Sequence, residues 1–190
     1  MKTLHPLFIL FLFSSCISIN SNGYRELSTQ KKLQLQDFSA NSVNEYDGNH
    51  PVKEMTAPAL KSYIKPKEYT WVYIFVPYCK DSSCKPLMWY ERTINNYKSK
   101  KINFLAISQV YDMGLINKQR QGFEHTVYII KDAAYGHNMY KARDRFTAEL
   151  LNDNPISRSR PAHMLFKRDS LIYYSAVMNK HAIDSVMARN

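Results

Sequence analysis

Two of the three cysteines, Cys79 and Cys84, lie five positions apart in the segment VPYCKDSSCKPLMWYE, residues 76–91. Two thiols so close in sequence can act as a redox dithiol, as a pair of metal ligands or as a structural disulfide. A disulfide requires Cα atoms about 4.4–6.8 Å apart. Residues five apart within one α-helix are separated by about 8.6 Å. A bonded pair therefore cannot lie wholly inside one helix.

The residues around the pair predict where the next helix begins. A proline and the run Asp81-Ser82-Ser83 end an apolar stretch, Ser83 is a good N-cap, and Pro86 is tolerated in a first turn. This places Cys84 at or near the first helical position. Free amides and the helix dipole there lower the pKa of a thiol. A lysine follows each cysteine and acts in the same direction.

Stretches of alternating type must position this pair. Buried strands are predicted at 70–76, 102–108 and 126–130, and a hairpin at 162–167 and 171–176. Helices are predicted at 57–64, 86–100, 111–123, 140–151 and 181–189. Strands that alternate with helices imply parallel pairing, and the hairpin adds antiparallel strands. The expected fold class is α/β, with a mixed central sheet and helices on both faces.

The charge and composition exclude some classes of function. The 190 residues suffice for one domain with extensions, and the net charge of +10 favours contact with anionic surfaces. Lys and Arg residues are scattered, however, and neither zinc-finger spacing nor an RNA-binding aromatic motif is present. We therefore expect no nucleic-acid partner.

The N-terminus predicts export. A lysine precedes an apolar run from Pro6 to Phe13, which is too short to span a bilayer and suits a signal peptide. The sequence Phe13-Ser14-Ser15-Cys16 resembles a bacterial lipoprotein signal. That resemblance implies a signal peptide at 1–15 and lipidation of Cys16, such as by palmitate. The alternative is a plain signal peptide with an incidental cysteine.

Residues 16–51 are polar and lack a sustained apolar period, so we expect a flexible tether before a folded domain at 52–190. If Cys16 carries lipid, the other two cysteines remain as one pair in an oxidising compartment. The expected location is the bacterial cell envelope, lipid-anchored and most simply on the periplasmic side. Ile17 after Cys16 weakly favours the outer membrane over the inner.

The domain resembles the thioredoxin-like family, especially membrane-tethered bacterial thiol–disulfide oxidoreductases. WVYIFVPYCKDSSCKPL is similar to that family's active-site segment, and SRPAHMLFKRDSLIYYS to its cis-proline strand. The resemblance implies that Cys79 attacks a client disulfide and Cys84 resolves it, without an organic cofactor. A cis Pro161 would place the Arg160 backbone beside the dithiol, where it pairs with the extended chain of the client. Tyr78 is expected to bind the client as well. The partners would be exported proteins with thiols or disulfides, and the upstream reductant or oxidant is not identified by the sequence.

The chain also departs from the family pattern. Four residues separate the cysteines instead of two, Tyr78 replaces a tryptophan, and Tyr73 stands where a buried carboxylate is common. The dipole argument alone favours Cys84 as the more acidic thiol, so the attacking cysteine stays open.

Two alternatives to catalysis use the same residues. One is an inert structural disulfide in a non-catalytic binding or scaffold module. The other is a copper-handling lipoprotein, in which both thiolates and a histidine hold Cu(I). His163 is the nearest candidate by topology, whereas His125 and His137 are weaker. We therefore expect no bound metal ion.

Overall fold

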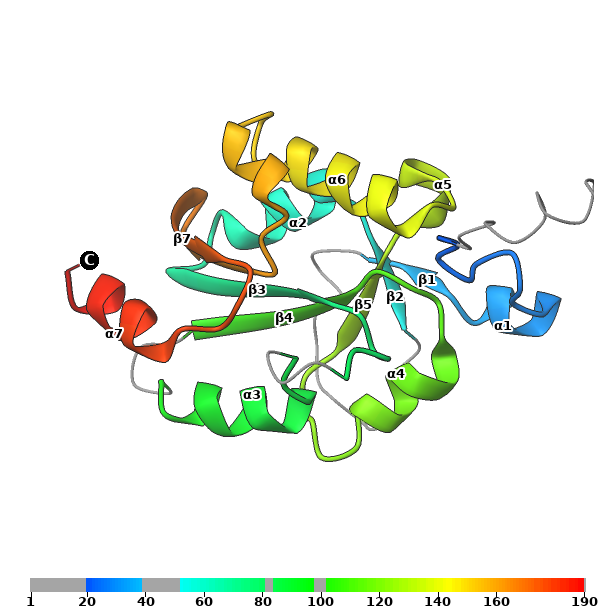
Figure 1. Cartoon of the computed structure of the whole chain (residues 1–190), viewed down its shortest axis with the longest axis horizontal. Coiled ribbons are helices and arrows are strands. Elements are labelled where there is room, and N and C mark those ends of the chain that lie inside the picture. Colours follow the sequence, from blue (N-terminus) through cyan, green and yellow to red (C-terminus); the bar gives the residue numbers. More distant parts are fainter. Residues whose placement is uncertain (1–19, 39–51, 81–83, 98–101, 190) are drawn as a thin grey trace, which may run out of the picture.

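A seven-stranded mixed β-sheet forms the centre of the computed structural model, which describes residues 20–38, 52–80, 84–97 and 102–189 (Figure 1). The strands are β1 (Gln36–Asp37), β2 (Lys53–Met55), β3 (Tyr69–Phe75), β4 (Ile102–Ser108), β5 (Val127–Ile130), β6 (His163–Lys167) and β7 (Ser170–Ser175). Their order is β1-β2-β5-β4-β3-β6-β7; β1 to β5 are parallel, and β6 and β7 are antiparallel to their neighbours. The expected α/β class, with a mixed central sheet, is confirmed.

Helices cover both faces of this sheet, as Figure 1 shows. One face carries α2 (Ala57–Ile64), α5 (Asp132–Tyr135) and α6 (Met139–Leu150). The other carries α3 (Leu87–Asn95), α4 (Met113–Gln119) and α7 (Lys180–Arg189). The short helix α1 (Thr29–Leu33) precedes β1, and a 3-10 helix, η4 (Pro155–Ser159), follows α6.

Strand β3 shows why both faces need helices. All seven of its residues are buried. Successive side chains of a strand point to opposite faces, so Val72 and Ile74 join the core beneath α2 and α6. Trp71 and Tyr73 join a second, aromatic core beneath α3. The apolar run 70–76 therefore behaves as predicted, and its end carries Cys79 to the edge of the sheet.

The predicted elements of the domain are otherwise confirmed, with adjusted ends. The helix predicted at 86–100 is described from Leu87 to Asn95, and the one predicted at 111–123 is the shorter α4. Asp112 sets the start of α4, because its side chain accepts a hydrogen bond from the Leu115 amide. The hairpin turns at Arg168, whose φ of 54° is left-handed.

Residues 20–38 differ from the flexible tether that their composition predicts. Asn22 is buried, β1 pairs with β2, and the Phe38 ring packs edge-on against Tyr63 and Tyr128. Tyr24, Leu27 and Leu35 also pack against the second core, so one buried amide and a few apolar side chains anchor a largely polar segment. Composition averages do not detect such anchors. We call residues 20–38 the N-terminal segment.

Other predictions for the N-terminal third fall outside the described residues. These are the signal peptide at 1–15, Cys16 and the rest of the tether at 17–19 and 39–51. Within the described ranges, no helix is both long and apolar enough to cross a membrane.

Candidate functional site

Cys79 and Cys84 form a disulfide at the carboxyl end of β3, with a Cα–Cα distance of 6.0 Å. Both residues are partly buried rather than enclosed. We call the described residues 77–80 and 84–86 the disulfide loop. Its first half is held by a backbone hydrogen bond from the Cys79 amide to the Val76 carbonyl, 3.1 Å long. The disulfide therefore lies at the sheet edge, within reach of a partner.

Both cysteines lie outside helix α3. The helix begins at Leu87, and Pro86, in extended conformation at φ −63° and ψ 152°, is its N-cap. The prediction that Cys84 lies at or near the first helical position is therefore wrong, because that position is Leu87. Ser83, the predicted cap, lies outside the described residues. The physical reason is Pro86, because a proline disfavours helical geometry in the residue before it. The helix dipole acts mainly within the first turn, so its effect on Cys84 is weaker than expected.

Gln119 holds the disulfide loop in place, and no sequence pattern predicts this role. Its side-chain oxygen accepts a hydrogen bond from the Leu87 amide, and its side-chain nitrogen donates to the Pro77 carbonyl, both at 3.3 Å. Pro86 has no side-chain group to cap α3, so a residue from α4 satisfies the first free amide of the helix. Gln119 thus joins both ends of the loop to α4.

The peptide bond before Pro161 is trans, because no described bond is cis. The cis-proline expectation is therefore wrong. Arg160 ends η4 in left-handed conformation, at φ 51° and ψ 57°. Its guanidinium makes two hydrogen bonds to Asp144, and its carbonyl accepts one from Arg143 at 2.5 Å. These contacts fix the turn, and one of them involves the Arg160 backbone, which the resemblance assigns to client binding.

The strand after Pro161 does reach the sheet as expected. The Ala162 carbonyl accepts from the Ile74 amide at 2.8 Å, and β6 then pairs with β3, which leads to the cysteines. Pro161 itself is buried. The predicted neighbourhood of β3 and β6 is therefore present, with a different backbone at the proline.

Tyr78 and Arg160 both contact the start of α6. Tyr78 is 48% exposed, and its hydroxyl donates to the sulfur of Met139 at 3.2 Å. The Arg160 guanidinium lies over the ring of Tyr140, 5.6 Å from its centroid. Partial burial and the neighbouring Tyr140 hydroxyl raise the pKa of Tyr78. The two predicted client-binding residues are thus joined through neighbouring residues of one helix.

The core beneath the carboxyl half of β3 is aromatic. Tyr73 is stacked on the ring of His163, its partner across β3 and β6, with centroids 4.6 Å apart. The Tyr90 hydroxyl lies 3.4 Å from Nε2 of His163. Burial, with a smaller contribution from the positive charge of Arg143, lowers the pKa of His163 to about 3. Burial also raises the pKa of Tyr73 and Tyr90. These three rings are therefore uncharged at neutral pH.

The three candidate copper-binding histidines have other surroundings. His163 is enclosed by aromatic rings, His125 lies 3.5 Å from the Glu91 carboxylate, and His137 lies 2.7 Å from that of Asp132. Among the residues that the structure describes, no three His, Cys, Asp or Glu side chains are grouped closely enough to hold a metal ion.

A polar network seats the N-terminal segment near this site. The Asn22 side-chain nitrogen donates to Asp132 at 2.8 Å, and the same carboxylate oxygen contacts His137. The Asn22 carbonyl accepts from the Tyr111 amide at 2.6 Å, and its amide donates to the His137 carbonyl at 2.7 Å. These hydrogen bonds thus join the N-terminal segment to the residues that follow β4 and β5.

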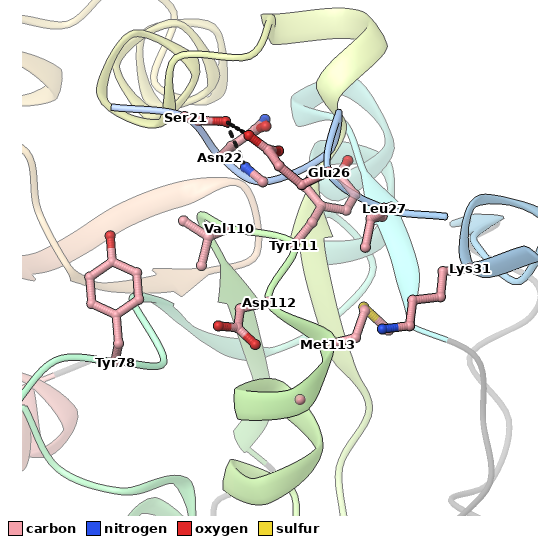
Figure 2. Close-up of a pocket in the computed structure, with 12 residues that line it drawn as sticks. Ser21, Asn22, Glu26, Leu27, Lys31, Tyr78, Val110, Tyr111, Asp112 and Met113 are labelled. Carbon is pink, nitrogen blue, oxygen red and sulfur yellow. Dashed lines mark hydrogen bonds between the residues drawn. The ribbon is translucent and has the colours of Figure 1, made fainter. Parts of the chain in front are cut away.

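Two hollows flank Tyr78. The disulfide groove, of about 670 Å³, is lined by Tyr78, Cys79 and Lys80 and by Met88, Leu115 and Lys118 of α3 and α4. The N-terminal pocket, of about 340 Å³, is lined by Asn22, Glu26, Lys31, Tyr78, Tyr111 and Asp112. Figure 2 shows Tyr78 on one side of the N-terminal pocket, with residues of the N-terminal segment along another.

Comparisons with known proteins give only distant structural likenesses. No family profile matches the sequence, and no curated protein matches it either. A thioredoxin-like protein from Bacteroides caccae is 16% identical, with a TM-score of 0.41, and the match covers 65% of this chain but 41% of that one. The thioredoxin domain of a thiol-disulfide oxidoreductase from Bacteroides vulgatus is 15% identical, with a TM-score of 0.45 and coverage of 68% and 84%.

A third solved structure, a putative electron transfer protein from Aquifex aeolicus, is 11% identical, with a TM-score of 0.43 and coverage of 70% and 88%. At these identities and scores, none of the likenesses assigns an activity to the chain.

Proposed function

We propose that this protein is a thiol–disulfide oxidoreductase that acts on exported proteins through Cys79 and Cys84. The observation that carries the proposal is the position of the disulfide. It joins a partly exposed pair at the carboxyl end of a central strand, and one of its cysteines lines an open groove. A staple that only stabilised the fold would have no need of an adjoining groove.

Cys79 is the better candidate for the attacking residue. It lines the disulfide groove, whereas Cys84 is not among the lining residues. In the reduced protein, the Cys79 thiolate attacks one sulfur of a client disulfide, and the other client sulfur leaves as a thiolate that takes up a proton. The Cys84 thiolate then attacks Cys79 and releases the second client thiol. Two electrons pass to the client, and a dithiol reductant must restore the pair.

The chemistry near the disulfide supports exchange that is not strongly accelerated. Tyr73 is buried with a raised pKa, so it is a poor proton acceptor at neutral pH. The exposed Lys80 and Lys85 still favour a thiolate electrostatically. We therefore expect slow turnover and a preference for clients that bind the groove.

We also propose that the protein is lipid-anchored at the cell envelope. The lipoprotein-like sequence at Cys16 supports an anchor that keeps the domain at the envelope, with the N-terminal segment docked on it. Membrane fractions should contain the wild-type protein, and the Cys16→Ser variant should move to the soluble fraction. Acylation of Cys16 can be read directly by mass spectrometry.

The activity is tested by reduction of insulin disulfides with a dithiol donor. The full chain carrying Cys16→Ser, in a neutral detergent, is compared with the same chain carrying Cys79→Ser or Cys84→Ser. We expect both variants to fall to the background rate. Only Cys84→Ser should accumulate a mixed disulfide with the client, because it keeps the attacking thiol and lacks the resolving one.

The alternative is a structural disulfide in a binding module, and two findings favour it. Pro161 is trans, and Cys84 lies outside the helix. An insulin rate no higher than background, together with a reduction potential below about −300 mV, would establish that alternative.

A further inference from the structure

The disulfide groove has an unusual charge. Lys80 and Lys118 lie on its lining, both are exposed, and no carboxylate contributes to the lining that the described residues form. Neither lysine forms an ion pair with a described residue. The rest of the lining includes the apolar Met88 and Leu115. The groove thus offers two available positive charges around an apolar surface, directly beside Cys79.

The neighbouring N-terminal pocket provides the contrast. Its lining includes two carboxylates, Glu26 and Asp112, together with the single cation Lys31. The Tyr78 side chain lines both hollows. Among the described lining residues, positive charge without a carboxylate is therefore found in the groove beside the disulfide and not in the hollow next to it.

We propose that the disulfide groove binds an acidic peptide segment, one whose carboxylates flank the client's reactive cysteine. This deepens the proposed function and rests on it for the identity of the bound segment as a client. Carboxylates near the cysteine would meet the two ammonium groups, and small apolar side chains would pack on Met88 and Leu115. Complementary charges at a solvent-exposed rim act mainly on association and selectivity, and salt screens them.

The groove is tested apart from the redox step with peptides that cannot exchange. Two peptides carry a serine in place of the client cysteine and differ only in having two glutamates or two lysines beside it. Each is titrated into the oxidised full chain carrying Cys16→Ser, in neutral detergent, and followed by NMR. We expect about tenfold tighter binding of the acidic peptide at low salt, with shifts at Lys80 and Leu115. The preference should shrink toward threefold or less at about 0.5 M salt.

Matched charge removal locates the effect. Lys80→Gln/Lys118→Gln should reduce the acidic preference to about twofold or less. Lys65→Gln/Arg189→Gln removes the same net charge from two exposed positions, one directly after α2 and one at the end of α7, which do not line the groove, and should keep the preference. Equal binding of the two peptides, or a preference that survives the Lys80/Lys118 change, would overturn the inference.

Exchange with the small neutral 2-hydroxyethyl disulfide distinguishes this failure from failure of the proposed function. Exchange without an acidic preference overturns the groove inference alone. An acidic preference without exchange supports the groove as a binding site and overturns the oxidoreductase proposal.

Discussion

The disulfide loop and the first residues of the N-terminal segment lie at the same edge of the sheet, yet they are held very differently. The N-terminal segment is seated through Asn22, whose backbone and side chain bond to Tyr111, Asp132 and His137. The disulfide loop is held by its own covalent bond, by a short-range backbone hydrogen bond, and by side-chain hydrogen bonds to α4 and α6. Beneath the first lies a polar network with a buried carboxylate, and beneath the second lie uncharged aromatic rings.

The difference shows where this fold can exchange partners. A buried network that is fully hydrogen-bonded is rigid, because each broken bond leaves an unsatisfied polar group. A loop with few bonds to its surroundings opens locally at lower free energy. The disulfide loop can therefore change its conformation more easily when a mixed disulfide forms. The N-terminal segment stays bonded to the neighbouring strand ends.

The largest expected effect is a loss of folding stability in acid, and it tests the aromatic core beneath the disulfide loop. His163 has a folded-state pKa of about 3, below the ordinary value near 6.5. The unfolded chain therefore binds the proton first. The stability that the neutral ring contributes is complete above about pH 6.5 and is lost as the pH falls toward 3. At about 1.4 kcal/mol per pKa unit, the loss is on the order of 4 kcal/mol.

Replacing the ring isolates this contribution. His163→Phe keeps an aromatic ring beside Tyr73 but cannot be protonated. When the pH falls from 7 to 4, the free energy of unfolding of the wild type should decrease by about 3 kcal/mol more than that of the variant. Leu165→Val, on the same strand and without a titratable group, should differ from wild type by a constant amount. Urea unfolding at several pH values measures all three proteins, and parallel curves for wild type and His163→Phe would contradict the prediction.

The fold could be predicted from the sequence because it depends on repeated signals. The apolar run of β3 and the stripe of Leu87, Tyr90 and Ile94 on α3 each repeat one message over several residues. The short spacing of Cys79 and Cys84, and the odd number of cysteines, likewise made a disulfide between these two residues one of the predicted possibilities. Averages over a window are robust where many residues agree.

The details of the site depend on single residues and could not be predicted in this way. The helix start moved to Leu87 because one proline outweighed a plausible serine cap. The bond before Pro161 is trans, in a turn fixed by the distant Arg143 and Asp144. The docking of Asn22 depends on partners about 110 positions away. No local pattern contains such long-range hydrogen bonds.

The second largest effect is expected when the polar network that holds the N-terminal segment is broken. Asn22→Leu has a similar volume, but it removes the donor to Asp132 and leaves that buried carboxylate short of a partner. We expect the free energy of unfolding to fall by about 3 kcal/mol. Exchange with a small neutral disulfide should continue under native conditions, because the disulfide groove contains no residue of the N-terminal segment.

Ser28→Ala is the matched control in the same segment. Ser28 caps the short, exposed helix α1 through a 3.3 Å bond to the Lys31 amide, so its loss should cost about 1 kcal/mol or less. If Asn22→Leu is no more destabilising than Ser28→Ala in urea unfolding, the polar network does not hold the segment, and the contrast between the two regions fails.

The smallest expected effect concerns the loosely held side. Gln119→Leu removes the acceptor for the Leu87 amide and the donor to the Pro77 carbonyl, while an apolar side chain of similar size remains. Hydrogen exchange at the Leu87 amide should accelerate about tenfold, and the global free energy of unfolding should fall by about 1 kcal/mol. Gln121→Leu also lies on the disulfide groove, but no described hydrogen bond from its side chain reaches the loop. It should leave Leu87 protected. Unchanged protection in Gln119→Leu would mean that the disulfide alone orders the loop, and that α4 does not position it.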